Sequence, residues 1–381
     1  MKGYVTTAAP SRLARQPAFW LFAALLVNCF LLVGLEQVSY LAAYPGAWLL
    51  SIILLAATAI PAALIIYRFD HFEPEPASMI AVALLWGGVI ALTFGGITNS
   101  WFLTFLQHVM PAGQVDAWGA AIVAPINEEL YKGLGLVIMY LMARSEFDSV
   151  MDGLVYGAMI GLGFQVMENV QYFMLATDES GGGPGGVVGM FFLRVVVSGL
   201  YSHMLFTGLM GFGFAYYVTQ RGRAAAHRVG VFVLCGVLAW AAHFVWNSPW
   251  LERLMSQGSG AFVMALIIKG LPFLVLLVLM AVFARRRESQ AFARLMAGEV
   301  GSDAVSMEEF EILRSGRKRR ATLRSMKQTK GPAARTVLKQ LMRAQMNLAL
   351  FQSKVASDDD PALEAQRDVV RRLRARLAAL G

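Results

Sequence analysis

Long apolar segments follow one another through residues 1–284, and short polar connections separate them. An α-helix rises about 1.5 Å per residue, so about 20 mostly apolar residues are needed to cross the hydrocarbon core of a bilayer. Eight segments are long and apolar enough: 17–35, 47–67, 77–96, 115–142, 149–176, 187–218, 229–249 and 261–284. We therefore predict an all-α fold, a multispanning membrane helix bundle with about eight transmembrane helices.

The chain changes character after Arg287, where charged residues replace the apolar run. Ser306-Met-Glu-Glu309 has the form of a capping box, in which a serine and a glutamate satisfy main-chain N–H groups at a helix start. Residues 333–355 and 361–381 have the pattern of two amphipathic helices, joined by Ala-Ser-Asp-Asp-Asp at 356–360. We predict two domains, a transmembrane helical domain at 1–284 and a basic helical tail at 285–381, with a helical hairpin at 333–381.

Composition excludes an ordinary soluble domain. Only 15% of the 381 residues are charged and 57% are hydrophobic, whereas an average soluble domain carries about 25% charged residues. The net charge of +8 is uneven, because residues 285–381 hold 21 Lys and Arg against 11 Asp and Glu. Since this tail directly follows the last apolar segment, we expect it to contact anionic lipid or a protein partner, and we expect no nucleic acid. Cys29 and Cys235 lie in apolar segments and predict no disulfide framework.

Basic residues in the connections predict the orientation of the helices. They precede the first segment and then fall on every second connection: Lys2, Arg12, Arg15, Arg68, Arg144, Arg221, Arg223, Arg228 and Arg285 to Arg287. Loops rich in Lys and Arg stay on the cytoplasmic side of a membrane. We therefore expect a multi-pass protein of the cell membrane with both termini in the cytoplasm.

Ionisable side chains interrupt four consecutive apolar segments. With the asparagines beside them they are Glu128, Glu129 and Lys132 in the fourth, Glu168 and Asn169 in the fifth, His203 in the sixth, and His243 and Asn247 in the seventh. An ionisable group at the bilayer centre costs at least ~2.5–3.5 kcal/mol, so such groups pair or face a cavity. Glu128 and Lys132 lie four residues apart, as do His243 and Asn247, so each pair shares a helix face. We expect all these groups to converge between the midplane and the outer face.

Such a group suits hydrolysis of an amide by water. A carboxylate can act as general base on the water, and a histidine can share or return the proton. An asparagine amide and a histidine N–H can stabilise the tetrahedral oxyanion. Lys132 lies close to two carboxylates and would keep at least one of them ionised despite burial.

The motifs that carry these residues resemble those of the PrsW family. They are Glu-Glu-x-x-Lys at 128–132, Phe-x-x-x-Glu-Asn at 164–169, a lone histidine at 203, and His-x-x-x-Asn at 243–247. The resemblance covers about residues 60–285, where "YRFDHFEPEP" at 67–76 also resembles a family feature. It implies a glutamic intramembrane protease that needs no metal cofactor, related to CAAX-prenyl endopeptidases and bacteriocin-processing enzymes. The first domain is then protease-like.

The resemblance also implies roles for these residues. Glu128 would activate the water, Glu129 would be its partner, and Lys132 would tune the pair. His243 and Asn247 would form the side of the site that stabilises the oxyanion. The implied substrate is a membrane-anchored protein, with site-1 cleavage of a single-pass anti-sigma factor near the outer membrane face as one case.

Two roles stay open at this stage. In the CAAX-prenyl branch a histidine stands where this chain has Glu168, so the division of work between Glu168 and His203 is undecided. Glu168 also has Arg194 and Lys269 as alternative ion-pair partners. We expect Asn169 to support the second motif.

Other classes of function remain as alternatives. Glu128, Glu129, His203 and His243 include side chains that bind zinc, although the sequence lacks His-Glu-x-x-His. Intramembrane carboxylates and histidines also form proton relays, so a proton-coupled transporter is a second alternative. A non-catalytic membrane scaffold is the third, since the superfamily that the motifs resemble includes a structural γ-secretase subunit.

Overall fold

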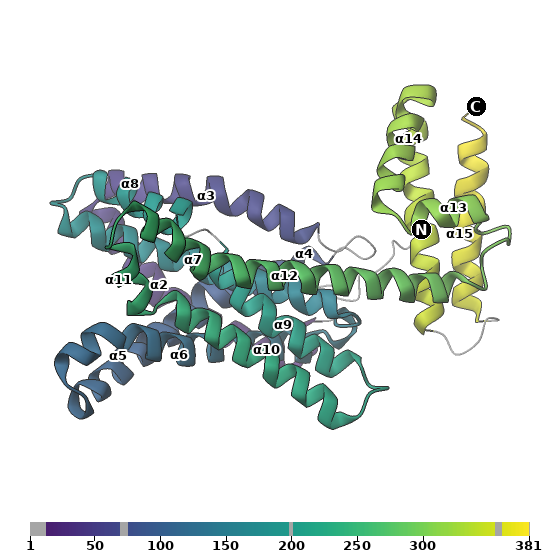
Figure 1. Ribbon diagram of the computed structural model, residues 1–381. Coiled ribbons are helices and arrows are strands. Elements are labelled where there is room, and N and C mark those ends of the chain that lie inside the picture. The colour runs from purple at the N-terminus through teal and green to yellow at the C-terminus, as the bar shows by residue number, and fades with distance from the viewer. Residues whose placement is uncertain (1–12, 69–74, 198–200, 355–359, 381) are drawn as a thin grey trace. The chain divides into compact units, whose positions relative to one another are not determined.

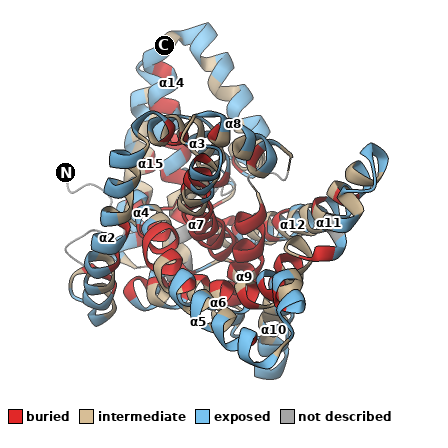
Figure 2. Cartoon of the chain, turned by 90° about the vertical axis from the view of Figure 1, so that its left-hand side faces the viewer, coloured by how far each residue is buried: buried red, intermediate tan, exposed pale blue. Residues whose placement is uncertain are grey.

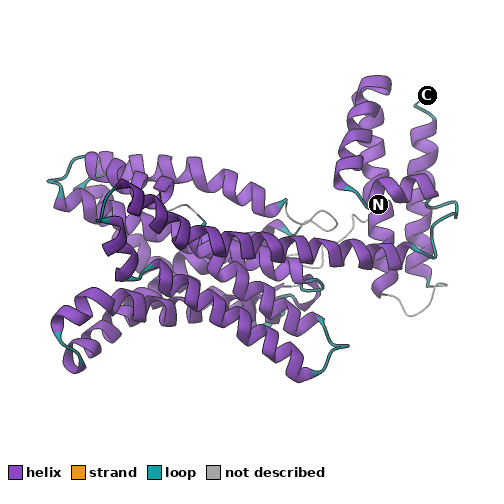
Figure 3. Cartoon of the chain, viewed as in Figure 1, coloured by secondary structure: helices purple, strands orange, loops and turns teal. Residues whose placement is uncertain are grey.

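The computed structural model describes residues 13–68, 75–197, 201–354 and 360–380, and the chain divides into two compact units at Ala284 (Figure 1). Over these residues every regular element is a helix, with one isolated bridge between Val300 and Val305 (Figure 3). The predicted all-α, multispanning class is confirmed. Lys2, Arg12, most of the 67–76 motif and most of the 356–360 linker lie outside the described residues.

The first unit contains the apolar helices. They are α2 (Pro17–Ala43), α3 (Pro45–Tyr67), α4 (Ala77–Leu85), α5 (Leu92–Val109), α6 (Ala112–Met142), α7 (Val150–Glu179), α8 (Gly185–Phe191), α9 (Ser202–Thr219), α10 (Ala225–Trp246) and α11 (Pro249–Met255). The π-helix η1 (Trp86–Ala91) joins α4 to α5, the 3₁₀ turn η2 (Arg144–Glu146) precedes α7, and the π-helix η3 (Phe192–Val197) follows α8. Helix α12 (Ser259–Met296) then leads into the second unit.

Six helices in the described residues are long and apolar enough to cross a membrane, counting α4, η1 and α5 as one run. A seventh span arises if α8 with η3 and α9 are taken together, although they are bent by 41° between Val197 and Ser202. Residues 187–218 therefore do not form the continuous helix that their apolar pattern predicts. The bend follows a π-helix, and π-turns are a common cause of helix kinks. Helix α6 is long enough to span, but its charged site residues lower its hydropathy.

Helices α7 and α9 form the buried centre of the first unit (Figure 2). Gly153, Gly157 and Gly161 lie one turn apart on α7 and face α9. A Cβ atom at Gly161 would overlap the main-chain oxygen of His203. Small residues at this spacing let two helix backbones approach closely in a membrane. The glycine face therefore fixes the distance between α7 and the start of α9, where His203 lies.

The second unit has its own core. It contains α13 (Met307–Leu313), α14 (Gly316–Lys354) and α15 (Pro361–Ala378). The capping box expected at Ser306 is confirmed, since its hydroxyl accepts from the Glu309 N–H and the Glu309 carboxylate accepts in return. Gly331 has a φ of 85° and interrupts α14. The two long helices contact each other, and the Gln366 amide donates to the Ala344 carbonyl at 2.7 Å.

The glycine face predicts how the first unit responds to a single methyl group. We expect Gly161→Ala to lower the stability of the detergent-solubilised protein by about 1–3 kcal/mol, the usual cost of overpacking. Gly236→Ala on α10 is the matched control, because nothing lies within 4 Å of a Cβ there. Thermal unfolding followed by circular dichroism compares them. An unchanged midpoint for Gly161→Ala would show that the α7–α9 contact is looser than described.

Candidate active site

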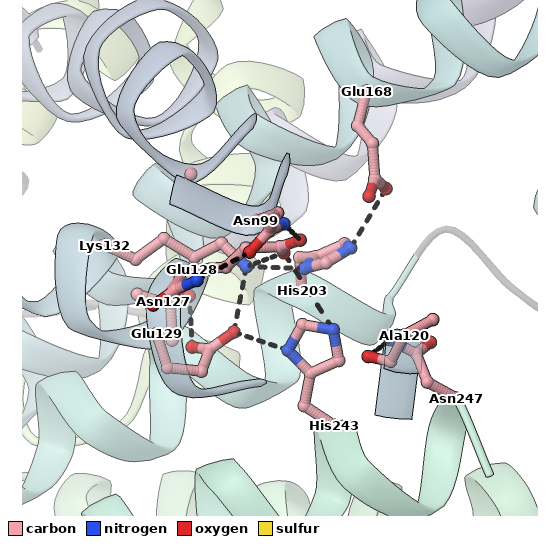
Figure 4. A network of polar contacts seen from close by, with 12 residues as sticks. Asn99, Ala120, Asn127, Glu128, Glu129, Lys132, Glu168, His203, His243 and Asn247 are labelled. Carbon is pink, nitrogen blue, oxygen red and sulfur yellow. Dashed lines mark hydrogen bonds and ion pairs between the residues drawn. The ribbon is translucent and has the colours of Figure 1, made fainter. Parts of the chain in front are cut away.

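Lys132 lies at the centre of the polar network inside the first unit (Figure 4). Its side chain is 0% exposed, and its Nζ contacts three groups. They are Glu128 Oε2 at 3.2 Å, Glu129 Oε1 at 2.8 Å and His203 Nδ1 at 2.7 Å. An ammonium group has three hydrogens and no acceptor, so these contacts use its full donor capacity. The spacing predicted both glutamate contacts on one helix, and the histidine contact joins α6 to α9.

His203 connects Lys132 to Glu168. Because the ammonium can only donate, His203 Nδ1 must be the acceptor of that bond. The hydrogen of the neutral ring then lies on Nε2, which is 3.2 Å from Glu168 Oε2. Both ring nitrogens are thus occupied in this arrangement. His203 orients groups on either side and has no free lone pair with which to accept a proton from water.

Glu129 is enclosed by partners from three helices. Its Oε1 lies 3.0 Å from His243 Nδ1 on α10, and its Oε2 accepts a hydrogen bond from Thr207 Oγ1 on α9 at 3.3 Å. The other ring nitrogen, His243 Nε2, lies 3.9 Å from Glu128 Oε2. This nitrogen therefore faces Glu128 at a distance that leaves the direct hydrogen bond unmade.

Glu128 is the glutamate of the pair that lines a cavity. The cavity has a volume of about 400 Å³, and its walls come from α2, α5, α6 and α7. Asn99 on α5 also lines it and donates from Nδ2 to Glu128 Oε1 at 3.1 Å. The Asn99 oxygen accepts in turn from Asn127 Nδ2 at 3.1 Å. Lys132 on one oxygen and Asn99 on the other therefore fix the Glu128 carboxylate at the cavity wall.

Glu168 lines the same cavity from α7. Its Oε2 accepts from Arg194 Nη2 at 2.6 Å as well as from His203. Arg194 also donates from Nε to Asn169 Oδ1 at 2.8 Å, and its guanidinium lies 3.7 Å from the centre of the Tyr172 ring. Of the two ion-pair partners considered for Glu168, Arg194 is the one that pairs with it, and the same carboxylate oxygen also contacts His203. Lys269 Nζ lies 4.8 Å from the centre of the Trp246 ring.

Asn247 is placed differently from the other predicted residues. It ends α10, and its Nδ2 lies 3.5 Å from the main-chain oxygen of Ala120 (Figure 4). The shared face predicted for His243 and Asn247 does not bring both side chains onto the carboxylates. The network thus joins Glu128, Glu129, Lys132, Glu168, His203 and His243 directly, and it includes Asn169 through Arg194.

The sequence pattern did not mark Asn99, Asn127 or Thr207, and it gave Arg194 only as an alternative ion-pair partner of Glu168. Uncharged amides and hydroxyls are much cheaper in a membrane than charges, so they gave little signal. Asn127 directly precedes Glu128, which could have drawn attention to it. Arg194 is an arginine within an apolar segment, and the cost of burying its charge favours pairing with a carboxylate such as Glu168.

The network leaves a negative charge unbalanced. Glu128, Glu129 and Glu168 contribute three carboxylates, whereas Lys132 and Arg194 contribute two cations. In a medium of low dielectric constant such an excess of negative charge attracts cations.

The side chains also fit a divalent metal. Glu128, His203 and His243 each offer a ligand atom, and these atoms lie within 4.8 Å of one another. One carboxylate and two histidines form a donor set found in catalytic zinc sites. Lys132 competes for this position, because its ammonium already contacts Glu128 and His203.

Comparison with known proteins places the chain in a family. Residues 75–286 match the family model described as "PrsW family intramembrane metalloprotease". Protease PrsW of Geobacillus kaustophilus is 30% identical over 151 residues, which are 39% of this chain and 58% of the relative. Protease PrsW of Oceanobacillus iheyensis is 27% identical over 164 residues, 43% of this chain and 64% of the relative. Protease PrsW of Bacillus subtilis is 29% identical over 112 residues, 28% of this chain and 46% of the relative.

The chain thus spans about half to two thirds of the length of these relatives, and no solved structure matches it. The matched region 75–286 contains every residue of the polar network from Asn99 to Asn247. It also covers more than half of the 381 residues. This multi-pass membrane protein therefore belongs to the PrsW family.

Proposed function

We propose that this protein is an intramembrane endopeptidase that hydrolyses a peptide bond of a membrane-anchored protein with water activated by Glu128. One observation carries the proposal. Glu128 is a carboxylate held by Lys132 and Asn99 at the wall of a cavity of about 400 Å³ inside a helix bundle. Family membership supports the reaction class. In this proposal the charged groups are buried because the peptide and its attacking water meet at Glu128.

The proposed reaction follows from the positions of Glu128 and His243. Glu128 accepts a proton from water, and the water oxygen forms a bond to the carbonyl carbon of the substrate. The C–N bond then breaks, and the proton passes to the departing nitrogen. His243 Nε2 lies 3.9 Å from Glu128 Oε2 and can relay that proton. The unbalanced negative charge of the network favours its uptake in the first step.

Glu129 and Lys132 serve this reaction without touching the cavity. Lys132 balances charge on both glutamates, and Glu129 holds His243 by its Nδ1. His243 Nε2 is thereby aimed at Glu128. Asn247 is our proposed oxyanion donor, as the family motif implies, and this requires its amide to exchange the Ala120 carbonyl for the substrate. Glu168 and His203 position Lys132 from the opposite side.

A metal would be held by Glu128, His203 and His243 and would supply a Lewis acid for the water and the carbonyl. We propose the metal-free reaction, because Lys132 already supplies positive charge among these groups. The substrate we propose is a single-pass protein cut near the outer membrane face, with an anti-sigma factor as the first candidate. We also propose that the protein lies in the cell membrane with both termini in the cytoplasm, because basic residues fall on every second connection.

The first prediction concerns Glu128→Gln. Removing a general base typically slows a reaction by about 10²–10⁴-fold. We therefore expect ectodomain fragments of a single-pass protein in the membrane proteome of cells that make the wild type, and none with Glu128→Gln at equal abundance. Asp116→Asn, an exposed residue on the same helix, is the matched control and should leave the fragments unchanged. Identical proteomes at rest and under envelope stress would favour the scaffold or the proton-coupled transporter.

The second prediction concerns Asn99, which touches the proposed base. With the substrate so identified, we expect Asn99→Ala to lower kcat by up to roughly 100-fold, the effect of a small misplacement of a reacting group. KM and thermal stability should change little, because Asn99 lies at the cavity wall and is half-buried. An equal loss of kcat and thermal stability would instead give Asn99 a structural role only.

The third prediction concerns the metal. We expect purified protein treated with EDTA and phenanthroline to keep its activity, because Lys132 takes the place of a metal cation. The metal content of the treated protein is measured by mass spectrometry. Loss of activity on chelation, followed by recovery on addition of zinc, would contradict the metal-free reaction and assign Glu128, His203 and His243 as ligands.

A further inference from the structure

Glu36 on α2 is a carboxylate in a membrane-spanning helix that lies before the matched residues 75–286. Its Oε1 accepts from Tyr40 Oη at 3.1 Å. Gln171 Nε2 on α7 lies 3.0 Å from Oε1 and 3.1 Å from Oε2. These partners are a phenol and an amide, and among the described residues Glu36 forms no ion pair with a cationic side chain. It is half-buried, so its charge is neither neutralised nor fully hydrated.

The two partners of Glu36 line the same cavity as Glu128. Tyr40 and Gln171 form part of its wall, together with Glu168. The cavity follows one face of α7 from Phe164 to Leu175, which is about 16 Å at 1.5 Å per residue. This length accommodates about five residues of extended peptide at ~3.3 Å each. The cavity therefore has room for a peptide that reaches from the Glu128 end to the Glu36 cluster.

The carboxylate of Glu36, which lies behind the lining residues Tyr40 and Gln171, favours a cation at this end of the cavity. Glu128 and Glu168 each have a cationic partner, whereas Glu36 has hydrogen bonds only. An unpaired carboxylate in a membrane costs several kcal/mol unless a cation or a proton reaches it. Phenol and amide groups beside a carboxylate also suit the several N–H donors of a lysine or arginine side chain.

We propose that Glu36, with Tyr40 and Gln171, forms a subsite for a basic side chain of the substrate. The cavity accommodates about five residues of extended peptide between the Glu128 end and the Glu36 cluster, so the basic residue lies within about five positions of the bond that is cut. The subsite names a substrate class for the proposed peptidase and so rests on the proposed function.

A panel of synthetic peptides in lipid nanodiscs tests this subsite. Each peptide carries one apolar span, in which a single lysine occupies successive positions and norleucine replaces it in a matched peptide. Cleavage sites and rates are read by mass spectrometry for wild type, Glu36→Gln, Glu128→Gln and Ser39→Ala. Ser39 is an exposed residue of the same helix, and its hydroxyl donates to the main-chain oxygen of Leu35 one turn earlier. Ser39→Ala is therefore the control.

We expect the wild type and Ser39→Ala to cut peptides with lysine at one position within about five residues of the cleaved bond roughly tenfold faster than their norleucine partners. Glu36→Gln should abolish this preference, so that each lysine peptide is cut at the same rate as its norleucine partner. A further variant, Glu36→Lys, is assayed with an additional set of peptides that carry glutamate in place of lysine. We expect it to cut the glutamate peptides faster than the lysine peptides.

The alternative results are distinguishable. A lysine preference that persists in Glu36→Gln, with cleavage still lost in Glu128→Gln, would overturn the subsite and leave the peptidase intact. Equal rates for lysine and norleucine peptides in the wild type would overturn it as well. If the wild type cuts no peptide of the panel, like Glu128→Gln, the proposed function fails together with the subsite. Retained circular dichroism of each variant verifies that Glu36 substitutions leave the helices folded.

Discussion

The contacts of one buried ammonium group hold the polar interior of this membrane protein together. Lys132 Nζ reaches two carboxylates of its own helix and a histidine of α9, and it is 0% exposed. Without this cation Glu128 and Glu129 would be adjacent negative charges in a medium that screens them poorly. Because an ammonium can only donate, the same contact also fixes the ring state of His203. One lysine thus sets charge, orientation and proton position in the site.

Close packing of the helices allows these contacts to form. Glycines on α7 bring the start of α9 close enough for His203 to lie between Lys132 and Glu168. The π-helix η3 places Arg194 against Glu168, which gives the second carboxylate site its own cation. Helix α10 adds His243 from the remaining side. Helices α7, α9 and α10 therefore pack against α6, and η3 adds Arg194 to Glu168 of α7. The cavity remains on the side where α2 and α5 complete the wall.

Charged residues, which are costly to place in a membrane, were predictable from the sequence as members of the site. Uncharged polar residues were not. Charged side chains in apolar segments must be paired, so the network of Glu128, Glu129, Lys132 and His203 follows from cost and spacing. Asn99 and Thr207 carry no charge, and the side chains of such residues commonly form hydrogen bonds within their own helix. Only the structure shows that they contact Glu128 and Glu129. The direction of the Asn247 amide also depends on a neighbouring main chain, which helical spacing does not specify.

The same distinction applies to the fold. The apolar pattern predicted a multispanning helical bundle, because the length and the hydropathy of a segment decide whether a helix can cross the bilayer. The pattern did not predict the bend between Val197 and Ser202, since a π-turn leaves hydropathy unchanged. In helix α6 the site residues do change the hydropathy, because Glu128, Glu129 and Lys132 make this span less apolar.

Photo-crosslinking from the cavity tests directly whether the substrate peptide lies at Glu128. p-Benzoylphenylalanine in place of Leu175, which lines the cavity, is introduced into the Glu128→Gln protein and irradiated in cells. We expect the captured segment to belong to a single-pass protein and to contain, within a few residues, the bond that the wild type cuts. Capture of lipid alone, or of segments far from any bond that the wild type cuts, would contradict it.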